Sequence, residues 1–200
     1  MTARRQQTRG AQTQQAIIEA ALAVVDERGH RDLDIQGVCA RAEASVGSFY
    51  HHLGSLEGLH AAVFDAILAD YRRAIGAALQ PRRSPRTFVE ALVRAHVEWV
   101  CEHPRRARVL YELRGGLEPA HDAEVRSGTR AFLVQIEESV ARWRDRIRPL
   151  PAVLLQPLVI GPAETLTRQW LAGRLPEGFD PRDVADELAR AAWRAVGLEP

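Results

Sequence analysis

The sequence predicts an all-α protein with about nine helices. Apolar residues recur with helical spacing along most of the chain, and no competing segment alternates apolar and polar residues as a strand would. The 200 residues are 46% apolar and 26% charged, a composition typical of a globular chain that buries a core.

Four helices are predicted in the first eighty residues from their apolar stripes and end signals. In chain order they cover residues 13–28, 35–42, 46–52 and 56–79. Gly29 is a typical helix terminator, and Asp34 and Ser45 are typical N-caps of the second and third helices. Only residues 43–45 separate these two short helices, which is the spacing of a helix-turn-helix.

Five more helices are predicted after the break at Pro81–Pro85. They cover residues 86–103, 104–113, 121–146, 151–172 and 182–196. Pro162 lacks the N–H that would bond the carbonyl of Leu158, so we expect a bend there. Packing within the protein could accommodate this bend, or the bend could leave an opening that faces a ligand.

Composition excludes several function classes. All 27 basic residues are arginine, which removes Schiff-base chemistry and a phosphate-loop lysine, and 26 acidic residues leave a net charge of +1. Cys39 and Cys101 lie in apolar helical patterns, as packed thiols do, so a disulfide scaffold is not expected. The basic N-terminus lacks the apolar core of a signal peptide and no 18-residue apolar run occurs, which predicts a cytoplasmic protein.

The third predicted helix has an unusual polar face. Ser48, Tyr50 and the pair His51-His52 carry hydrogen-bonding groups, whereas Phe49 and Leu53 are four residues apart and predict an inward face. Taken singly, each polar residue could be an ordinary solvated or capping side chain. A zinc site is not favoured, because adjacent histidines on a helix point about 100° apart.

Residues 17–67 resemble the N-terminal DNA-binding domain of the tetracycline-repressor (TetR) family of transcriptional regulators. The resemblance lies in Ala20-Ala21-Leu22 and Glu27-Arg28-Gly29 of the first helix, Ala40-Arg41-Ala42 before the turn, the run SVGSFYHHL from Ser45, and SLEGL from Ser55. It implies a DNA-binding domain at residues 1–60 and a helical effector-binding and dimerisation domain at residues 61–200. It also implies a DNA-binding regulator, which we expect to be a repressor that binds operator DNA as a homodimer.

The resemblance also implies roles for matching positions. Ser45, Val46 and Ser48 are implied to contact base edges or adjacent phosphates. Tyr50 and His51 are implied to contact phosphate and the groove wall. Gln36 is implied to contact the DNA backbone.

Three residues depart from the family pattern. Glu43 replaces the usual turn glycine, so the turn either avoids positive φ or is strained. Val46 replaces a commonly polar or basic residue and could contact a thymine methyl. Leu56 replaces a frequent lysine, which removes one phosphate contact.

The charge of the N-terminal region is unusual for a DNA-binding domain. Residues 1–60 contain six arginines and seven acidic residues, a net charge of −1. Arg4, Arg5 and Arg9 precede the first acidic residue, within a basic segment at residues 1–12. This segment is either an arm that follows the DNA backbone or enters a minor groove, or a disordered tail.

The C-terminal two thirds predict an effector site and a dimer interface. The expected effector contacts are His96, Trp99, His103, Tyr111 and Phe132, although each of them taken singly is more typical of an ordinary core residue. They favour a small, largely apolar molecule. The last two predicted helices present more apolar surface than one small core can bury, and the candidate interface residues are Leu155, Leu158, Leu166, Trp170, Leu188 and Trp193.

Two alternatives belong to other classes. An all-helical enzyme would use Glu112, Glu164, His96 and His103 as acid/base groups, but the chain contains no recognisable catalytic, phosphate-loop or metal motif. No cofactor or metal is therefore predicted. A helical interaction scaffold with a degenerate helix-turn-helix is the other alternative, favoured by the acidic balance and by Val46 and Leu56.

Overall fold

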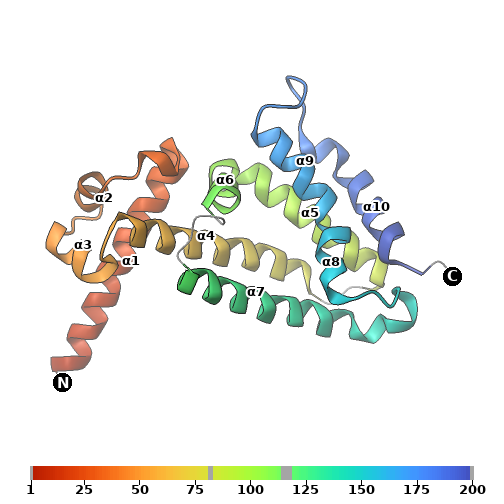
Figure 1. The fold of residues 1–200 in the computed structure, drawn as a ribbon, viewed down its shortest axis with the longest axis horizontal. Helices are drawn as coiled ribbons and strands as arrows, with labels where there is room; N and C mark the ends of the chain where they lie inside the picture. Colours follow the sequence, from red (N-terminus) through yellow and green to blue (C-terminus); the bar gives the residue numbers. More distant parts are fainter. Residues whose placement is uncertain (1, 81–82, 114–118, 199–200) are drawn as a thin grey trace. The chain divides into compact units, whose positions relative to one another are not determined.

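The computed structural model describes the backbone of residues 2–80, 83–113 and 119–198 (Figure 1). Within these ranges the chain forms ten α-helices and three short 3-10 helices, and it contains no strand longer than an isolated bridge between Ile147 and Gly197. The predicted all-α class is therefore confirmed. No helix among the described residues is both long and apolar enough to cross a membrane.

The first half of the chain has the α-helices that the sequence predicts, together with one short 3-10 helix, η1, that was not predicted. They are α1 (Thr2–Arg28), η1 (His30–Asp32), α2 (Ile35–Arg41), α3 (Val46–Leu53), α4 (Leu56–Ala78) and α5 (Pro85–Glu102). The prediction was wrong about the start of α1, which begins at Thr2 and not near Thr13. Residues 2–12 are polar and carry no apolar stripe, yet their arginine, glutamine and alanine residues have good helix propensity.

The second half departs from the prediction at three helices, because the helix predicted over residues 121–146 becomes a 3-10 helix after Val140, the one over residues 182–196 begins as a 3-10 helix, and the one over residues 151–172 is broken. The elements are α6 (Pro104–Leu113), α7 (Pro119–Val140), η2 (Ala141–Arg146), α8 (Ala152–Val159), α9 (Gly161–Leu171), η3 (Pro181–Val184) and α10 (Ala185–Val196). The predicted helix over residues 151–172 is thus two helices that meet at Ile160. Pro162 occupies the first turn of α9, where a missing N–H costs nothing, so the expected bend at this proline is replaced by a break before it.

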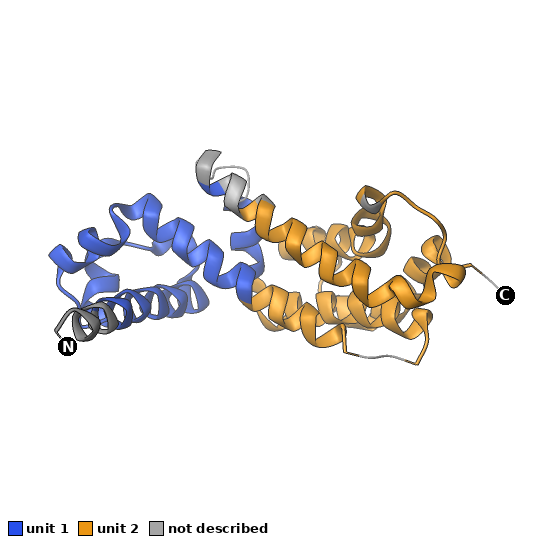
Figure 2. Cartoon of the chain, turned by 90° about the horizontal axis from the view of Figure 1, so that it is seen from below, with its two compact units in different colours: residues 1–69, 105–122 blue, residues 70–104, 123–200 orange. Residues whose placement is uncertain are grey.

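The chain divides into two compact units (Figure 2). Unit 1 comprises residues 1–69 and 105–122, and unit 2 comprises residues 70–104 and 123–200. Helix α4 continues from unit 1 into unit 2, and α6 belongs to unit 1 almost entirely although it lies between two helices of unit 2 in the sequence. The functional boundary predicted near residue 60 stays a prediction.

Unit 1 packs its three N-terminal helices and the start of α4 around fully buried side chains. Ile17 and Val25 of α1, Phe49 of α3 and Leu59 and Val63 of α4 have no exposed surface. A helix as short as α3 is not stable alone in water, so this packing determines its position.

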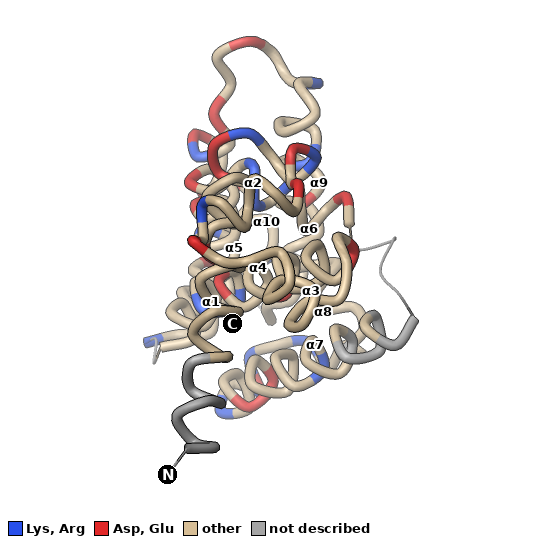
Figure 3. Tube along the Cα trace, turned by 90° about the vertical axis from the view of Figure 1, so that its left-hand side faces the viewer, with Lys and Arg blue, Asp and Glu red and all other residues tan. Residues whose placement is uncertain are grey.

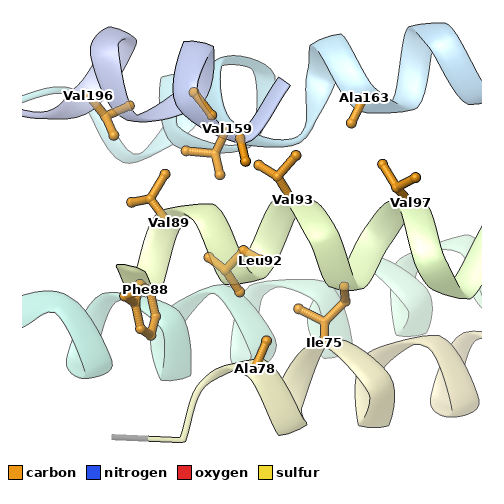
Figure 4. Packing of buried hydrophobic residues seen from close by; sticks show 12 residues of the cluster. Ile75, Ala78, Phe88, Val89, Leu92, Val93, Val97, Val159, Ala163 and Val196 are labelled. Atoms are coloured by element: carbon orange, nitrogen blue, oxygen red, sulfur yellow. The ribbon is translucent and has the colours of Figure 1, made fainter. Parts of the chain in front are cut away.

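Unit 2 is centred on α5 (Figure 4). Val89, Val93 and Val97 point from α5 toward Val159 of α8, Ala163 of α9 and Val196 of α10, whereas Phe88 and Leu92 lie on the side of Ile75 and Ala78 of α4. Helix α5 therefore forms the middle layer of the unit, with apolar residues on both sides.

Candidate functional site

The turn between α2 and α3 ends α2 with a Schellman arrangement. The Ala44 N–H donates to the Cys39 carbonyl at 3.0 Å and the Glu43 N–H to the Ala40 carbonyl at 3.3 Å. This geometry places Glu43 at φ 52°, the left-handed region that glycine adopts without cost. Of the two possibilities left by the sequence, the structure shows the strained turn.

Helix α3 is fixed at its start and along its inner face. The Ser45 hydroxyl accepts a hydrogen bond from the Ser48 N–H at 3.1 Å and thereby caps the helix, while Phe49 is fully buried. Because the hydroxyl accepts through its oxygen, its own proton is still available to an acceptor outside the helix.

The end of α3 is fixed by Gly58 of the next helix. The Gly58 N–H donates to the Ser55 hydroxyl at 3.1 Å, and a Cβ built on Gly58 would lie 1.9 Å from the Leu53 carbonyl oxygen. Any side chain there would displace the backbone at the end of α3. Gly58 therefore sets the angle at which the chain leaves α3, a role that only the three-dimensional contact reveals.

The outer face of α3 carries most of the predicted DNA contacts. Val46 is 44% and Tyr50 52% exposed, Ser45 and His51 are also exposed, and Ser48 is half-buried. Helix α3 contains no Asp, Glu, Lys or Arg and is therefore tan in Figure 3, and its last turn carries His51 and His52. The face therefore offers hydroxyl, imidazole and methyl groups in place of guanidinium groups.

His52 contacts α1 instead of facing outward with its neighbour. A Cβ built on Gly10 would lie 3.3 Å from Cε1 of His52, so α1 passes close to this ring. The rings of His51 and His52 meet edge to face at 5.0 Å. Only His51 was a predicted DNA contact, and it is the more exposed of the two.

The remaining predicted DNA contacts lie in α1 and α2. Gln36 is exposed in the first turn of α2, where the Asp34 carboxylate caps the helix by accepting from the Gly37 N–H at 2.7 Å. The side chains of Arg4, Arg5 and Arg9 lie outside the described residues, although α1 includes their backbone.

Ion pairs engage part of the acidic charge of the N-terminal region. The Arg41 guanidinium binds Glu27 through two hydrogen bonds of 2.6 and 2.8 Å and holds the pKa of this carboxyl below its ordinary value. Arg106 binds both carboxylate oxygens of Asp26, at 2.8 and 2.5 Å. These acids, together with the cap Asp34, are held by N–H donors within unit 1.

A second group of polar and aromatic side chains lies in unit 2, around His96. The Tyr71 hydroxyl lies 2.9 Å from Nδ1 of His96, and the Thr167 hydroxyl lies 3.5 Å from Nε2. Because the Thr167 hydroxyl donates to the Ala163 or Glu164 carbonyl, it accepts from Nε2–H of His96. Nδ1 then accepts from Tyr71, which defines the tautomer of the ring.

His96 is only 3% exposed, and burial lowers its pKa to about 4. The carboxylate of Glu164 opposes this shift, but it is paired with Arg168 at 2.7 Å. The ring is therefore neutral near pH 7.

Trp99 connects this group to the end of α5. Its indole N–H donates to the Asp70 carboxylate at 3.1 Å, and its ring meets Tyr71 at 5.0 Å and His103 at 5.5 Å between centroids. The structure thus brings together His96, Trp99 and His103 among the predicted effector contacts.

The other two predicted effector contacts are Phe132 and Tyr111. Phe132 packs against the apolar core cluster of unit 2, and Tyr111 is a half-buried residue of α6 in unit 1. Tyr71, Asp70 and Thr167, which are partners of His96 and Trp99, were not predicted as site residues from the sequence. Tyr71 had a visible signal, because it interrupts the apolar stripe of α4 with a hydroxyl that needs a partner when buried.

The predicted dimer residues divide into two sets. Leu158, Leu188 and Trp193 pack against the core of their own chain. Leu155, Leu166 and Trp170 are half-buried and are not part of that core cluster, and Leu166 and Trp170 are one helical turn apart on α9. Val153, which is 77% exposed, and Leu154 add apolar surface on α8.

Both glutamates among the acid/base candidates of the enzyme alternative are engaged in ion pairs. Glu112 binds Arg31 at 2.9 Å and Glu164 binds Arg168. Among the described residues no group of three or more histidine, cysteine, aspartate or glutamate side chains could hold a metal ion.

Comparison with known proteins confirms the family resemblance over residues 17–63, which match the sequence model of the bacterial regulatory proteins of the tetR family. No curated protein matches the chain.

Solved structures share the fold over nearly the whole chain. A TetR family transcription regulator from Marinobacter aquaeolei VT8 matches with a TM-score of 0.69 at 19% identity, covering 96% of this chain and 100% of the other. A TetR family regulator from Shewanella sp. PV-4 gives 0.68 at 22% identity, covering 94% and 99%. The transcriptional regulator FadR from Bacillus subtilis, in complex with stearoyl-CoA, gives 0.68 at 13% identity, covering 89% and 96%. The chain thus has the fold of TetR family transcription regulators.

Proposed function

We propose that this protein is a ligand-responsive, DNA-binding transcriptional regulator, acting as a repressor in the cytoplasm. The observation that carries the proposal is the exposed outer face of α3. Its inner residue Phe49 is fully buried and its cap and exit are fixed by Ser45 and Gly58, so Val46 and Tyr50 are held outward on a rigid support. This is the arrangement in which a recognition helix enters a major groove.

The protein binds DNA as a homodimer in this proposal. One helix-turn-helix reads few base pairs, and symmetric pairing of two copies doubles the site. Support comes from the apolar side chains of α8 and α9 that lie outside the core cluster, such as Leu155, Leu166 and Trp170. The operator is then an inverted repeat with half-sites about 34 Å apart or somewhat more.

The effector in this proposal is a small, largely apolar molecule that binds in unit 2 and releases the DNA. Support comes from the aromatic group around Trp99 and from the FadR structure, whose bound molecule is stearoyl-CoA. A tenfold loss of DNA affinity requires about 1.4 kcal/mol of coupling, and DNA must weaken effector binding by the same factor.

Selection of bound duplexes from a random pool tests the proposal. We expect enrichment of inverted repeats bound by two copies of the chain. A single asymmetric half-site bound by one copy would contradict the dimer, and no enrichment at low salt would favour an interaction scaffold. The matched control is a Val46→Asp/Tyr50→Ala variant, in which exposed residues change while Phe49 and the cap of α3 are kept.

A further inference from the structure

Four exposed arginines are concentrated in one short segment of unit 2. The segment lies between α7 and α8 and comprises most of η2 and the two residues after it (Figure 1). Its arginines, which we call the arginine run, are Arg142, Arg144, Arg146 and Arg148. Asp145 is the one acidic residue among them, so residues 142–148 carry four positive charges and one negative charge. This is a strongly cationic stretch in a chain whose net charge is only +1.

The residues that alternate with these arginines fix the backbone of the segment. Trp143 is half-buried, and its ring lies 5.6 Å from that of Phe88, which is fully buried. Ile147 is also half-buried and forms an antiparallel bridge with Gly197, just after the end of α10. Because these two apolar side chains are held against the unit, the arginines between and beside them are left at the surface. The arginine run is therefore presented from a defined backbone.

The arginine run differs from the arginines that form ion pairs elsewhere in unit 2. Arg73, Arg94 and Arg168 each bind a carboxylate, at distances between 2.6 and 2.8 Å. Among the described residues, no member of the run forms an ion pair, neither with Asp145 nor with Glu138 in the last turn of α7. No carboxylate in direct contact therefore cancels the charges of the run.

Two side chains of the run contact uncharged groups. The Arg142 guanidinium lies over the Trp143 ring, 4.1 Å from its centroid. Nε of Arg148 donates to the Gly197 carbonyl at 3.2 Å. Such contacts orient a guanidinium and leave its charge and most of its five N–H donors available. An anion can therefore bind to the run without breaking an ion pair between described residues.

The length of the run suits a row of phosphates better than a single anion. A 3-10 helix rises about 2.0 Å per residue and an extended segment about 3.3 Å, so Arg142 and Arg148 lie at most roughly 15 Å apart along the chain. One DNA strand carries a phosphate about every 3.4 Å of helix axis, which gives about four phosphates over this length. Guanidinium groups bind phosphate oxygens through paired hydrogen bonds. A ligand with one phosphate would leave most of the run without a partner.

We propose that the arginine run is a second nucleic-acid contact, which binds the phosphate backbone of duplex DNA without sequence preference. Phosphate contacts carry no sequence information by themselves, and the Trp143 ring is covered by Arg142 instead of being open to a base. Such a contact keeps the chain on DNA and lets it move along the duplex. It supplies the sequence-independent attraction that residues 1–60 lack, since their net charge is −1.

The test measures the affinity of the full chain for a duplex of random sequence. All proteins carry Val46→Asp/Tyr50→Ala, which changes the exposed face of α3 and so removes its contribution to binding. Fluorescence anisotropy of the labelled duplex gives the association constant at several NaCl concentrations. The slope of its logarithm against the logarithm of the salt concentration reports the number of phosphate contacts.

Two pairs of arginines are compared in this background. Arg144→Gln/Arg146→Gln removes two charges of the run, and neither side chain makes a hydrogen bond or ring contact with a described residue. Each phosphate contact contributes about 0.9 to the slope, so we expect a slope shallower by about 1.8 and an affinity at low salt reduced at least about fivefold. The matched control, Arg130→Gln/Arg174→Gln, removes two exposed arginines of unit 2 outside the run. It should change the affinity by less than about twofold, because distant exposed charges are screened by salt.

Two outcomes would overturn the proposal. Equal losses of affinity in the two variants would show a general effect of net charge. An unchanged slope in Arg144→Gln/Arg146→Gln would show that the run contacts no phosphates. If this variant does not fold, Arg144→Gln alone should still make the slope shallower by about 0.9.

Other anionic partners are distinguished by competition. We expect poly-glutamate of equal total charge to displace the duplex at least about tenfold less well, because it releases fewer condensed counterions. Equal displacement would overturn the assignment to nucleic acid and indicate an acidic protein segment. Vesicles of phosphatidylglycerol that displace the duplex equally well would overturn it in favour of a membrane surface.

Failure of the arginine run and failure of the proposed regulator give different results. Selection from a random pool with the wild-type chain tests sequence-specific binding through α3. A chain that enriches no sequence but keeps a slope that depends on the run would refute the regulator and support the run. Enrichment of inverted repeats with a slope that does not depend on the run would do the reverse.

Discussion

Acidification should destabilise the protein through His96. The ring is buried between Tyr71 and Thr167, and burial lowers its pKa from 6.5 to about 4. In the unfolded chain the same ring titrates near its ordinary value, so the unfolded state binds more protons between pH 4 and 6.5. The free energy of unfolding is therefore unaffected by His96 above pH 6.5, and it decreases as the pH falls from 6.5 toward 4.

The size of the loss follows from the shift. At about 1.36 kcal/mol per pKa unit, a displacement from 6.5 to about 4 corresponds to ~3 kcal/mol of unfolding free energy. This is a large part of the total stability of a typical domain. Carboxylates also titrate in this range, so the prediction concerns the part of the pH dependence that disappears with His96.

The assay compares wild type with His96→Gln by urea unfolding, followed by tryptophan fluorescence between pH 7.5 and 4.5. Glutamine can accept from Tyr71 and donate to Thr167 but does not titrate. Wild type should lose ~2–3 kcal/mol more than the variant over this range. Parallel pH profiles would refute the reasoning, because they would mean that His96 binds the same number of protons in the folded and unfolded chain.

Four further predictions concern the helix-turn-helix and the dimer. Glu43→Gly should stabilise the chain by ~0.5–1 kcal/mol in urea, because relief of the left-handed strain exceeds the entropy cost of glycine, and a loss of stability would show that the turn is not strained. Gly58→Ala should destabilise it by ~1–3 kcal/mol, whereas Gly76→Ala, in the same helix with open space around it, should not; equal effects would contradict the contact with the end of α3. Tyr50→Phe should weaken binding by ~1 kcal/mol for all duplexes alike, and unchanged affinity would remove this hydroxyl from the DNA contacts. Trp170→Arg should give monomers in sedimentation, and a persistent dimer would place the interface elsewhere.

The sequence predicts the helices well where each buries an apolar stripe and carries its own end signals. Asp34 and Ser45 act as the caps that their position before an apolar stripe predicts. Residues 2–12 were not predicted to be helical, because an apolar stripe is present in the sequence only where a helix packs against the rest of the protein. The sequence predicts a bend at Pro162, whereas the helix breaks at Ile160. Proline is compatible with a kink inside a helix and with the first turn of a new helix, and only packing selects between these two arrangements.

The outward position of Tyr50 could be predicted from the sequence, because Phe49 and Leu53 predict the inward face of this short helix, whereas its role toward DNA stays an expectation from the family resemblance. The partners of His96 could not be predicted from the sequence, since Tyr71 lies 25 residues before it and Thr167 lies 71 residues after it. Spacing in the sequence carries no information about such contacts, which depend on how three helices pack. The same is true of Asp26 and Arg106, which lie 80 residues apart.

The net charge of the N-terminal region is a poor guide to its affinity for DNA, because its acidic residues are not equivalent. Glu27 is bound by Arg41 and Asp26 by Arg106. The positive charge of each guanidinium therefore cancels part of the electric field of its carboxylate at short range. The same pairs also occupy these guanidinium groups, which makes them poor partners for phosphate. Attraction to the DNA backbone must then come from other cations of the chain and from neutral donors such as the Tyr50 hydroxyl, which do not release counterions. In the proposed complex with DNA, affinity should therefore depend less on salt than it does for a lysine-rich domain, and more on the fixed geometry of α3.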